Sequence, residues 1–122
     1  PMVSVSIEGD HVRLNVQGWD KVWAVKSQLD IPLANILSVR IAPEEARGWW
    51  HGIRMPGTQI PGIIIAGTFY QHDGAVFYDV HDPEQTIVLE LDHEHFKRLV
   101  VQVDDPAATV AMIETALHSR SA

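Results

Sequence analysis

Alternation of apolar and polar residues near the N-terminus is the feature that most constrains the fold of this chain. Apolar residues occupy every second position over 3–7 and again over 12–16. A period of two is typical of strands that bury one face. Gly9 and Asp10 separate the two runs, so residues 3–17 are predicted to form a β-hairpin.

Strand patterns continue through most of the chain. Apolar residues alternate over 29–33, where Pro32 cannot donate a hydrogen bond to a neighbouring strand, which indicates an edge or bulged strand. Residues 19–26 are predicted to form a short helix or helical turn, and residues 43–62 a long irregular stretch. Further strands are predicted at 36–41, 63–70, 75–80, 86–91 and 98–103.

The C-terminal segment has a clear helical pattern. Asp105 suits the N-cap position of a helix, and Pro106 suits the first helical position. Val110, Ile113 and Leu117 then fall on one face of that helix. A helix with one apolar stripe can cover an open end of a curved antiparallel sheet. At 122 residues the whole chain, 1–122, is expected to form one domain.

This order of elements resembles the pleckstrin-homology (PH) superfold. The phrase IPLANILSVRI resembles a turn between adjacent strands in bacterial PH-like proteins. The phrases GIRMPGTQIPGIIIAGTF and RLVVQVDDPAATVAMI resemble small uncharacterised bacterial, especially actinobacterial, proteins of similar length. The resemblance covers most of the chain. It implies a mainly β fold, a partly open antiparallel β-barrel of about seven strands capped by a C-terminal α-helix, and it implies no established activity.

The charge of the chain is negative and unevenly placed. The net charge is −7, and residues 73–122 carry ten acidic but only three basic residues. Residues 1–72 carry six of each. Because an acidic surface repels phosphate backbones and anionic lipid, the composition argues against a nucleic-acid partner.

Several classes of protein are disfavoured by what the sequence lacks. It has no cysteine, which excludes disulfides, thiolate metal sites and a cysteine nucleophile. No apolar run approaches the ~20 residues of a membrane span. The N-terminal residues show no signal-peptide pattern. A cytoplasmic protein without a transmembrane segment is therefore expected.

The segment 52–69 has a glycine at every fifth position. Gly57 and Gly62 each follow a proline, which suits type II turns. The segment contains neither GxxxxGK[ST] nor GxGxxG, so a nucleotide-binding loop is unsupported. We interpret it as a rigid corner that leads into a strand, and the isoleucine run 63–65 predicts that this strand is buried on both faces.

The best candidate binding site lies in the long stretch just before that strand. It comprises five residues of the types enriched at binding hot spots, which are Arg47, Trp49, Trp50, His51 and Arg54. Two tryptophans in one loop are costly to expose to water. The loop therefore either contacts a partner or folds back over the barrel.

Metal and catalytic sites have weaker support. His93 and His95 would face the same way on a strand and could bind zinc, but a further ligand is needed, and they lie at a predicted turn among acidic residues. No serine lies in a GxSxG motif. Asp104 and Asp105 are better explained by the helix start than as paired catalytic carboxylates. No catalytic residue, metal site or cofactor is predicted.

These patterns favour a non-enzymatic binding or assembly module that contacts partners through the 47–62 loop and a sheet edge. The alternative is a small metal-binding protein or enzyme that uses loop histidines such as His51. The expected partner is another protein or a second copy, first of all in a homodimer with Trp49 or Trp50 in or beside the interface. Phosphoinositide binding is not expected, because the first hairpin turn is acidic and only Arg13 lies near it.

Overall fold

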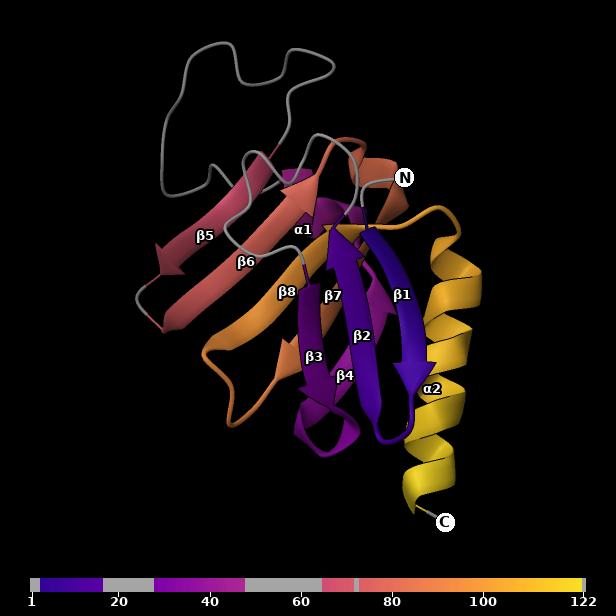
Figure 1. Cartoon of the computed structure of the whole chain (residues 1–122). Helices are drawn as coiled ribbons and strands as arrows, with labels where there is room; N and C mark the ends of the chain where they lie inside the picture. The colour runs from indigo at the N-terminus through magenta and orange to yellow at the C-terminus, as the bar shows by residue number, and fades with distance from the viewer. Residues whose placement is uncertain (1–2, 17–27, 48–64, 72, 122) are drawn as a thin grey trace, which may run out of the picture.

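A computed structural model of the chain describes residues 3–16, 28–47, 65–71 and 73–121 (Figure 1). Within these residues the fold is mainly β, with eight strands in two sheets followed by the helix α2 (Pro106–Ser121). None of the helices in this part of the chain is long and apolar enough to cross a membrane.

The first sheet is an antiparallel meander of three strands. They are β1 (Val3–Glu8), β2 (His11–Val16) and β3 (Gln28–Pro32), in the order β1-β2-β3. Gly9 adopts the positive φ of 63° that the tight β1–β2 turn uses. The predicted hairpin is confirmed, and Pro32 ends an edge strand as predicted. The predicted helix at 19–26 lies outside the described residues.

The second sheet has five strands in the order β4-β7-β8-β6-β5. They are β4 (Ile36–Ile41), β5 (Ile65–Gln71), β6 (Gly74–Val80), β7 (Thr86–Leu91) and β8 (Phe96–Gln102). The bounds predicted for β4 and β7 are confirmed. β8 begins before the predicted residue 98, because Phe96 pairs with Ala75 of β6 and is buried.

The expected mainly β fold with a C-terminal helix is confirmed, but the strand arrangement differs in two respects from the expected partly open antiparallel barrel of about seven strands. The described residues form two separate sheets of eight strands in total and no closed barrel. In addition, β6 and β8 are parallel. The chain leaves β6 through the short 3-10 helix η3 (Pro83–Gln85), runs back along β7 and turns once more. β8 then fills the place between β7 and β6, so it must run in the direction of β6.

A helical turn begins the stretch that was predicted to be irregular. This is α1 (Pro43–Arg47), which has proline at its first position and Glu44 and Glu45 in its first turn. Proline at that position and acidic residues at an N-terminus both favour a helix start. The rest of the predicted irregular stretch, and Ile63 and Ile64 of the predicted isoleucine-rich strand, lie outside the described residues.

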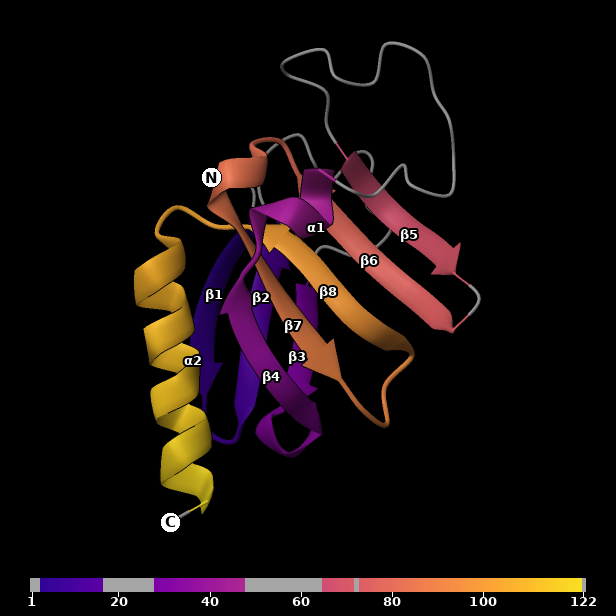
Figure 2. The same cartoon turned by 180° about the vertical axis from the view of Figure 1, so that it is seen from behind.

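The main core lies between the two sheets and under α2. The Asp105 side chain accepts a hydrogen bond from the Ala108 backbone N–H at 3.0 Å, which confirms the predicted N-cap. Ile113 is fully buried, and Val110 and Leu117 pack beside it, as the apolar stripe predicts. Figures 1 and 2 show α2 lying along the edges of β1 and β4, where it closes the space between the sheets on that side.

A second, smaller core covers the outer face of the five-stranded sheet. Successive residues of β6 point to opposite faces, so Phe77 belongs to the main core and Tyr78 to the second. The other buried members of the second core are Ala42, Val76, Val80, Val88 and Val100. Burial on both faces explains why β6, β7 and β8 read as nearly continuous apolar runs.

Candidate functional site

The predicted binding residues lie at the limit of what the structure describes. Arg47 is the last residue of α1. Its side chain, and all of Trp49, Trp50, His51 and Arg54, lie outside the described residues. The structure instead describes the two elements that flank this segment, which are α1 before it and β5 after it.

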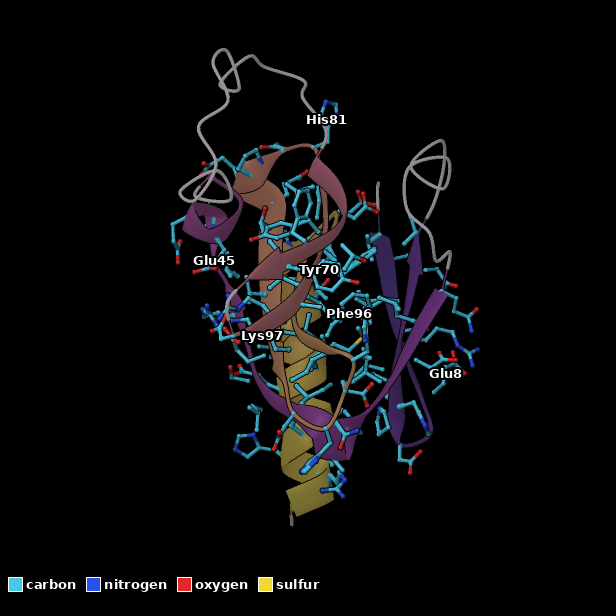
Figure 3. The ribbon with its side chains drawn as sticks, turned by 90° about the vertical axis from the view of Figure 1, so that its left-hand side faces the viewer. Glu8, Glu45, Tyr70, His81, Phe96 and Lys97 are labelled. Carbon is cyan, nitrogen blue, oxygen red and sulfur yellow. The ribbon has the colours of Figure 1, made fainter. Side chains whose placement is uncertain are left out.

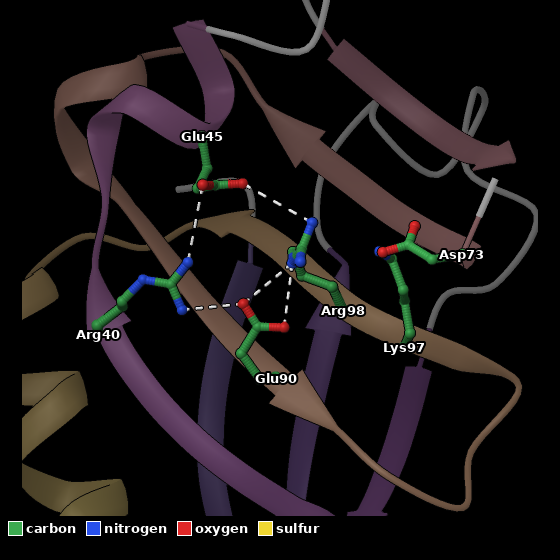
Figure 4. A network of polar contacts seen from close by, with 6 residues as sticks. All are labelled: Arg40, Glu45, Asp73, Glu90, Lys97 and Arg98. Atoms are coloured by element: carbon green, nitrogen blue, oxygen red, sulfur yellow. Dashed lines mark hydrogen bonds and ion pairs between the residues drawn. The ribbon is translucent and has the colours of Figure 1, made fainter. Parts of the chain in front are cut away.

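A network of ion pairs attaches α1 to the outer face of the sheet (Figure 4). Glu90 of β7 is at its centre. Arg40 of β4 donates through Nη1 to the Oε2 atom of Glu90 at 3.0 Å, and Arg98 of β8 donates through Nε to both carboxylate oxygens. Glu45 of α1 then reaches both arginines, at 3.7 Å from Arg40 and 3.9 Å from Arg98.

The composition of this network indicates a structural role. Two arginines face two glutamates, so its formal charge is zero and each guanidinium already lies near two carboxylates. An anionic ligand would therefore have to displace a carboxylate. By linking three adjacent strands to Glu45, the network holds α1 against the outer face of the sheet.

A second ion pair fixes the β5–β6 turn. Lys97 of β8 (labelled in Figure 3) pairs with Asp73 in that turn, and Figure 4 shows both side chains. Gly74 has a φ of 138°, and a Cβ atom there would lie 3.2 Å from Cδ of Lys97. With a Cβ atom at residue 74 the lysine stem would have to shift by a few tenths of an ångström, and the positive φ itself favours glycine.

β5 forms an open edge of the five-stranded sheet. Among the described residues its only hydrogen-bonded neighbour is β6, in a regular register from Ile65 opposite Val80 to Gln71 opposite Gly74. Tyr70 is 77% exposed although it is a large aromatic residue. It lies opposite Ala75 of the main core, so its side chain is on the sheet face that looks toward the three-stranded sheet (Figure 3).

The other three edge strands carry devices that discourage pairing with another chain. Charged residues lie in all three, namely Glu8 in β1, Asp30 in β3 and Arg40 in β4. β3 also ends in Pro32, β4 has a register irregularity at its start, and α2 flanks β1 and β4. β5, with the sequence IAGTFYQ, has no charge, proline or bulge. Charges, prolines and bulges are the usual features that keep an exposed edge strand from pairing with another chain, and β5 lacks them.

The histidines proposed as metal ligands lie in the β7–β8 connection, which confirms the predicted turn. His93 has a positive φ of 61°, is exposed, and lies with its Nε2 atom 3.4 Å from an oxygen of Asp92. The His95 ring packs against Phe96, with ring centroids 4.8 Å apart. Neither histidine lies on a strand. No group of three or more potential metal ligands occurs among the residues that the structure describes.

The first hairpin holds Arg13 in an ion pair, and His11 at the turn lies with its Nδ1 atom 2.6 Å from an oxygen of Asp10. Arg13 donates through Nε to Asp30 of β3 at 2.8 Å. This hydrogen bond lowers the pKa of Asp30 and raises the pKa of Arg13. Glu8 and Asp10 are exposed at the turn itself. A phosphate group approaching this turn would meet two carboxylates and an arginine that is already paired.

Sequence reasoning missed two polar residues near the ends of the central strands. Gln102 accepts hydrogen bonds through Oε1 from the backbone N–H groups of His81 and Asp82, at 2.7 and 2.6 Å. It thereby holds the connection that leaves β6. Asp79 of β6 is fully buried on the same face as Phe77. The signal in both cases is one polar residue that interrupts a run of apolar residues, and the sequence does not indicate what that residue contacts.

No protein-family model matches the chain, and no curated protein or solved structure matches it either. Function is therefore inferred from the sequence and the described residues.

Proposed function

We propose that the protein is a non-enzymatic binding or assembly module that uses the β5 edge together with the 47–62 segment. The observation that carries this proposal is the character of β5. It is a regular seven-residue edge strand without charge, proline or bulge, and it bears an exposed tyrosine. Exposed backbone donors and acceptors on such a strand are a template for pairing with another chain.

The position of the two flanking elements supports the same surface. The ion-pair network around Glu90 holds α1 against the sheet, and the Lys97–Asp73 pair holds the far end of β5. Both ends of the proposed surface are thus attached to the core of the five-stranded sheet. An edge strand that is already formed loses little conformational entropy when a partner binds.

The partner in this proposal is a protein chain, first of all a second copy. Nucleic acid and phosphoinositides are not proposed partners. The charge of −7 and the acidic first turn both disfavour phosphate groups, and Arg13 is engaged by Asp30.

The PH-like identity and the bacterial, actinobacterial-type origin belong to this proposal as well. Support comes from the mainly β architecture and from α2, which packs along sheet edges after the last strand. The parallel β6–β8 pair departs from the antiparallel order that the resemblance implies. The cytoplasmic location stays a prediction from the sequence.

Two measurements on the purified wild-type chain test the proposal. Light scattering at tens of micromolar should give a mass near twice the 13.6 kDa of the monomer. Elemental analysis should find no stoichiometric metal. A strictly monomeric protein would contradict the proposed self-association. Stoichiometric zinc, iron or nickel would favour the alternative of a small metal-binding protein or enzyme that uses loop histidines.

A further inference from the structure

We infer that β5 pairs antiparallel with β5 of a second copy about a twofold axis, so that two five-stranded sheets join into one continuous sheet. This inference rests on the proposed function and specifies its surface and its partner. The centre of the dimer contact in this inference is the β5 edge, whereas the sequence pointed to Trp49 and Trp50.

The choice of strand follows from comparing the four edges. β1 and β4 lie beside α2, and β3 combines the charged Asp30 with Pro32. β5 has seven residues, all uncharged, and pairs with β6 in an uninterrupted register. Its ladder can therefore continue onto a further strand without a break. The charge next to it in the chain, Asp73 in the β5–β6 turn, is paired with Lys97.

The choice of a second copy follows from charge and closure. Each copy carries a net charge of −7, and β5 has no charged residue, so two copies can meet along β5 without placing like charges opposite each other. An antiparallel strand edge is complementary to itself under a twofold rotation. Among the residues that the structure describes, each copy has one unprotected edge, so this pairing covers that edge and stops at two copies. A head-to-tail contact would instead leave edges open to further growth.

The register of complete overlap makes a specific geometric prediction. It places Thr68, the middle residue of β5, opposite Thr68 of the second copy, and Tyr70 opposite Ala66. In either kind of antiparallel pair the Cα atoms of opposite residues lie about 4.5–5.5 Å apart. The Tyr70 ring, which is 77% exposed, would then lie over the second copy's strand and be largely covered.

The absence of cysteine makes this geometry directly testable. Thr68→Cys introduces a lone thiol at the twofold axis with little change in side-chain size. The expected Cα separation lies within the range for a disulfide, so mild oxidation should give a covalent dimer in high yield. The control is Leu37→Cys on β4, which is 66% exposed at the opposite edge of the sheet and should give little dimer.

A second variant covers the case in which Thr68→Cys folds poorly. Spin labels on Tyr70→Cys should lie close together, because four residues along the strand span about 14 Å at ~3.4 Å per residue. Labels on Leu37→Cys should lie about 40 Å apart, at ~4.8 Å per strand spacing across the joined sheet. A short distance for Tyr70→Cys and a long one for Leu37→Cys support the pairing.

Failure of this inference is distinguishable from failure of the proposed function. A wild-type dimer that gives no Thr68→Cys disulfide and a long distance for labelled Tyr70→Cys would overturn β5 pairing, while the assembly role would stand. A protein that is monomeric by light scattering, forms no Thr68→Cys disulfide and shows no short distance between labels on Tyr70→Cys would overturn both the pairing and self-association.

Discussion

Arg98 of β8 donates through Nε to both carboxylate oxygens of Glu90 on β7, at 3.1 and 3.0 Å. The two residues lie opposite each other in the β7–β8 ladder, and about a quarter or less of each side chain is exposed. The same carboxylate binds Arg40, so Glu90 neutralises arginines on both of its neighbouring strands. The sheet thus has a charged centre on a face whose surroundings are apolar.

Glu90→Gln should lower the free energy of unfolding by about 1–3 kcal/mol, because the two arginines lose their shared charged acceptor. Chemical denaturation followed by circular dichroism measures the change. Glu44→Gln is the matched control, since Glu44 is exposed in α1, and it should change stability by no more than about 0.5 kcal/mol. Equal effects of the two substitutions would show that the network contributes nothing specific.

Gln102→Leu should destabilise the protein by about 2–4 kcal/mol, because the backbone N–H groups of His81 and Asp82 both lose their acceptor. Hydrogen exchange should also become faster at these two amides. Gln28→Leu, an exposed glutamine in the edge strand β3, should leave both properties nearly unchanged. Unaltered exchange at residues 81 and 82 in Gln102→Leu would contradict the assigned contact.

Gly74→Ala should cost more stability than Gly9→Ala. Both glycines have positive φ, which costs an alanine about 1–2 kcal/mol. At Gly9 the added Cβ meets nothing within 4 Å, whereas at Gly74 it meets the Lys97 side chain at 3.2 Å. Thermal unfolding of the two variants provides the comparison. A Gly9→Ala protein that is the less stable of the two would refute the expected order.

The carboxyl group of Asp30 should titrate below its ordinary pKa of 3.8, because Arg13 donates a hydrogen bond to the ionised form. A depressed pKa in the folded state means that the stabilisation is present above the unfolded value and is lost as the pH falls through the folded value. NMR titration of the wild type and of Arg13→Gln measures the effect. The Asp30 midpoint should rise in Arg13→Gln, and an unchanged midpoint would rule out the pairing in solution.

The first hairpin and the start of α2 could be predicted from the sequence because neighbouring residues in the chain determine both. The alternation around Gly9 predicts the first hairpin, and Asp105 with Pro106 predicts the start of α2. The parallel β6–β8 pair could not be predicted in this way. It depends on where the chain returns after β7, and strands that are apolar on both faces give no periodic signal that would order them.

The candidate site was predictable only in outline. A sheet edge was expected to contact partners, and Pro32 marked β3 as an edge strand, but no sequence signal marked β5 as one. The lack of charge and proline in β5 becomes informative only once the sheet order is known. The network around Glu90 joins residues 50 positions apart, Arg40 and Glu90, and no spacing rule connects them. The predicted residues Trp49 and Trp50 lie outside the described part of the chain, so their role stays a prediction.

The most direct test of the central claim is the mass in solution of three proteins at tens of micromolar. They are the wild type, Tyr70→Glu on the β5 edge and Leu37→Glu on the β4 edge. The β5 account predicts twice 13.6 kDa for the wild type and Leu37→Glu, and 13.6 kDa for Tyr70→Glu, because a carboxylate would replace each tyrosine ring that the second copy's strand covers. A wild type that stays at 13.6 kDa, or a Tyr70→Glu protein that still dimerises fully, would contradict it.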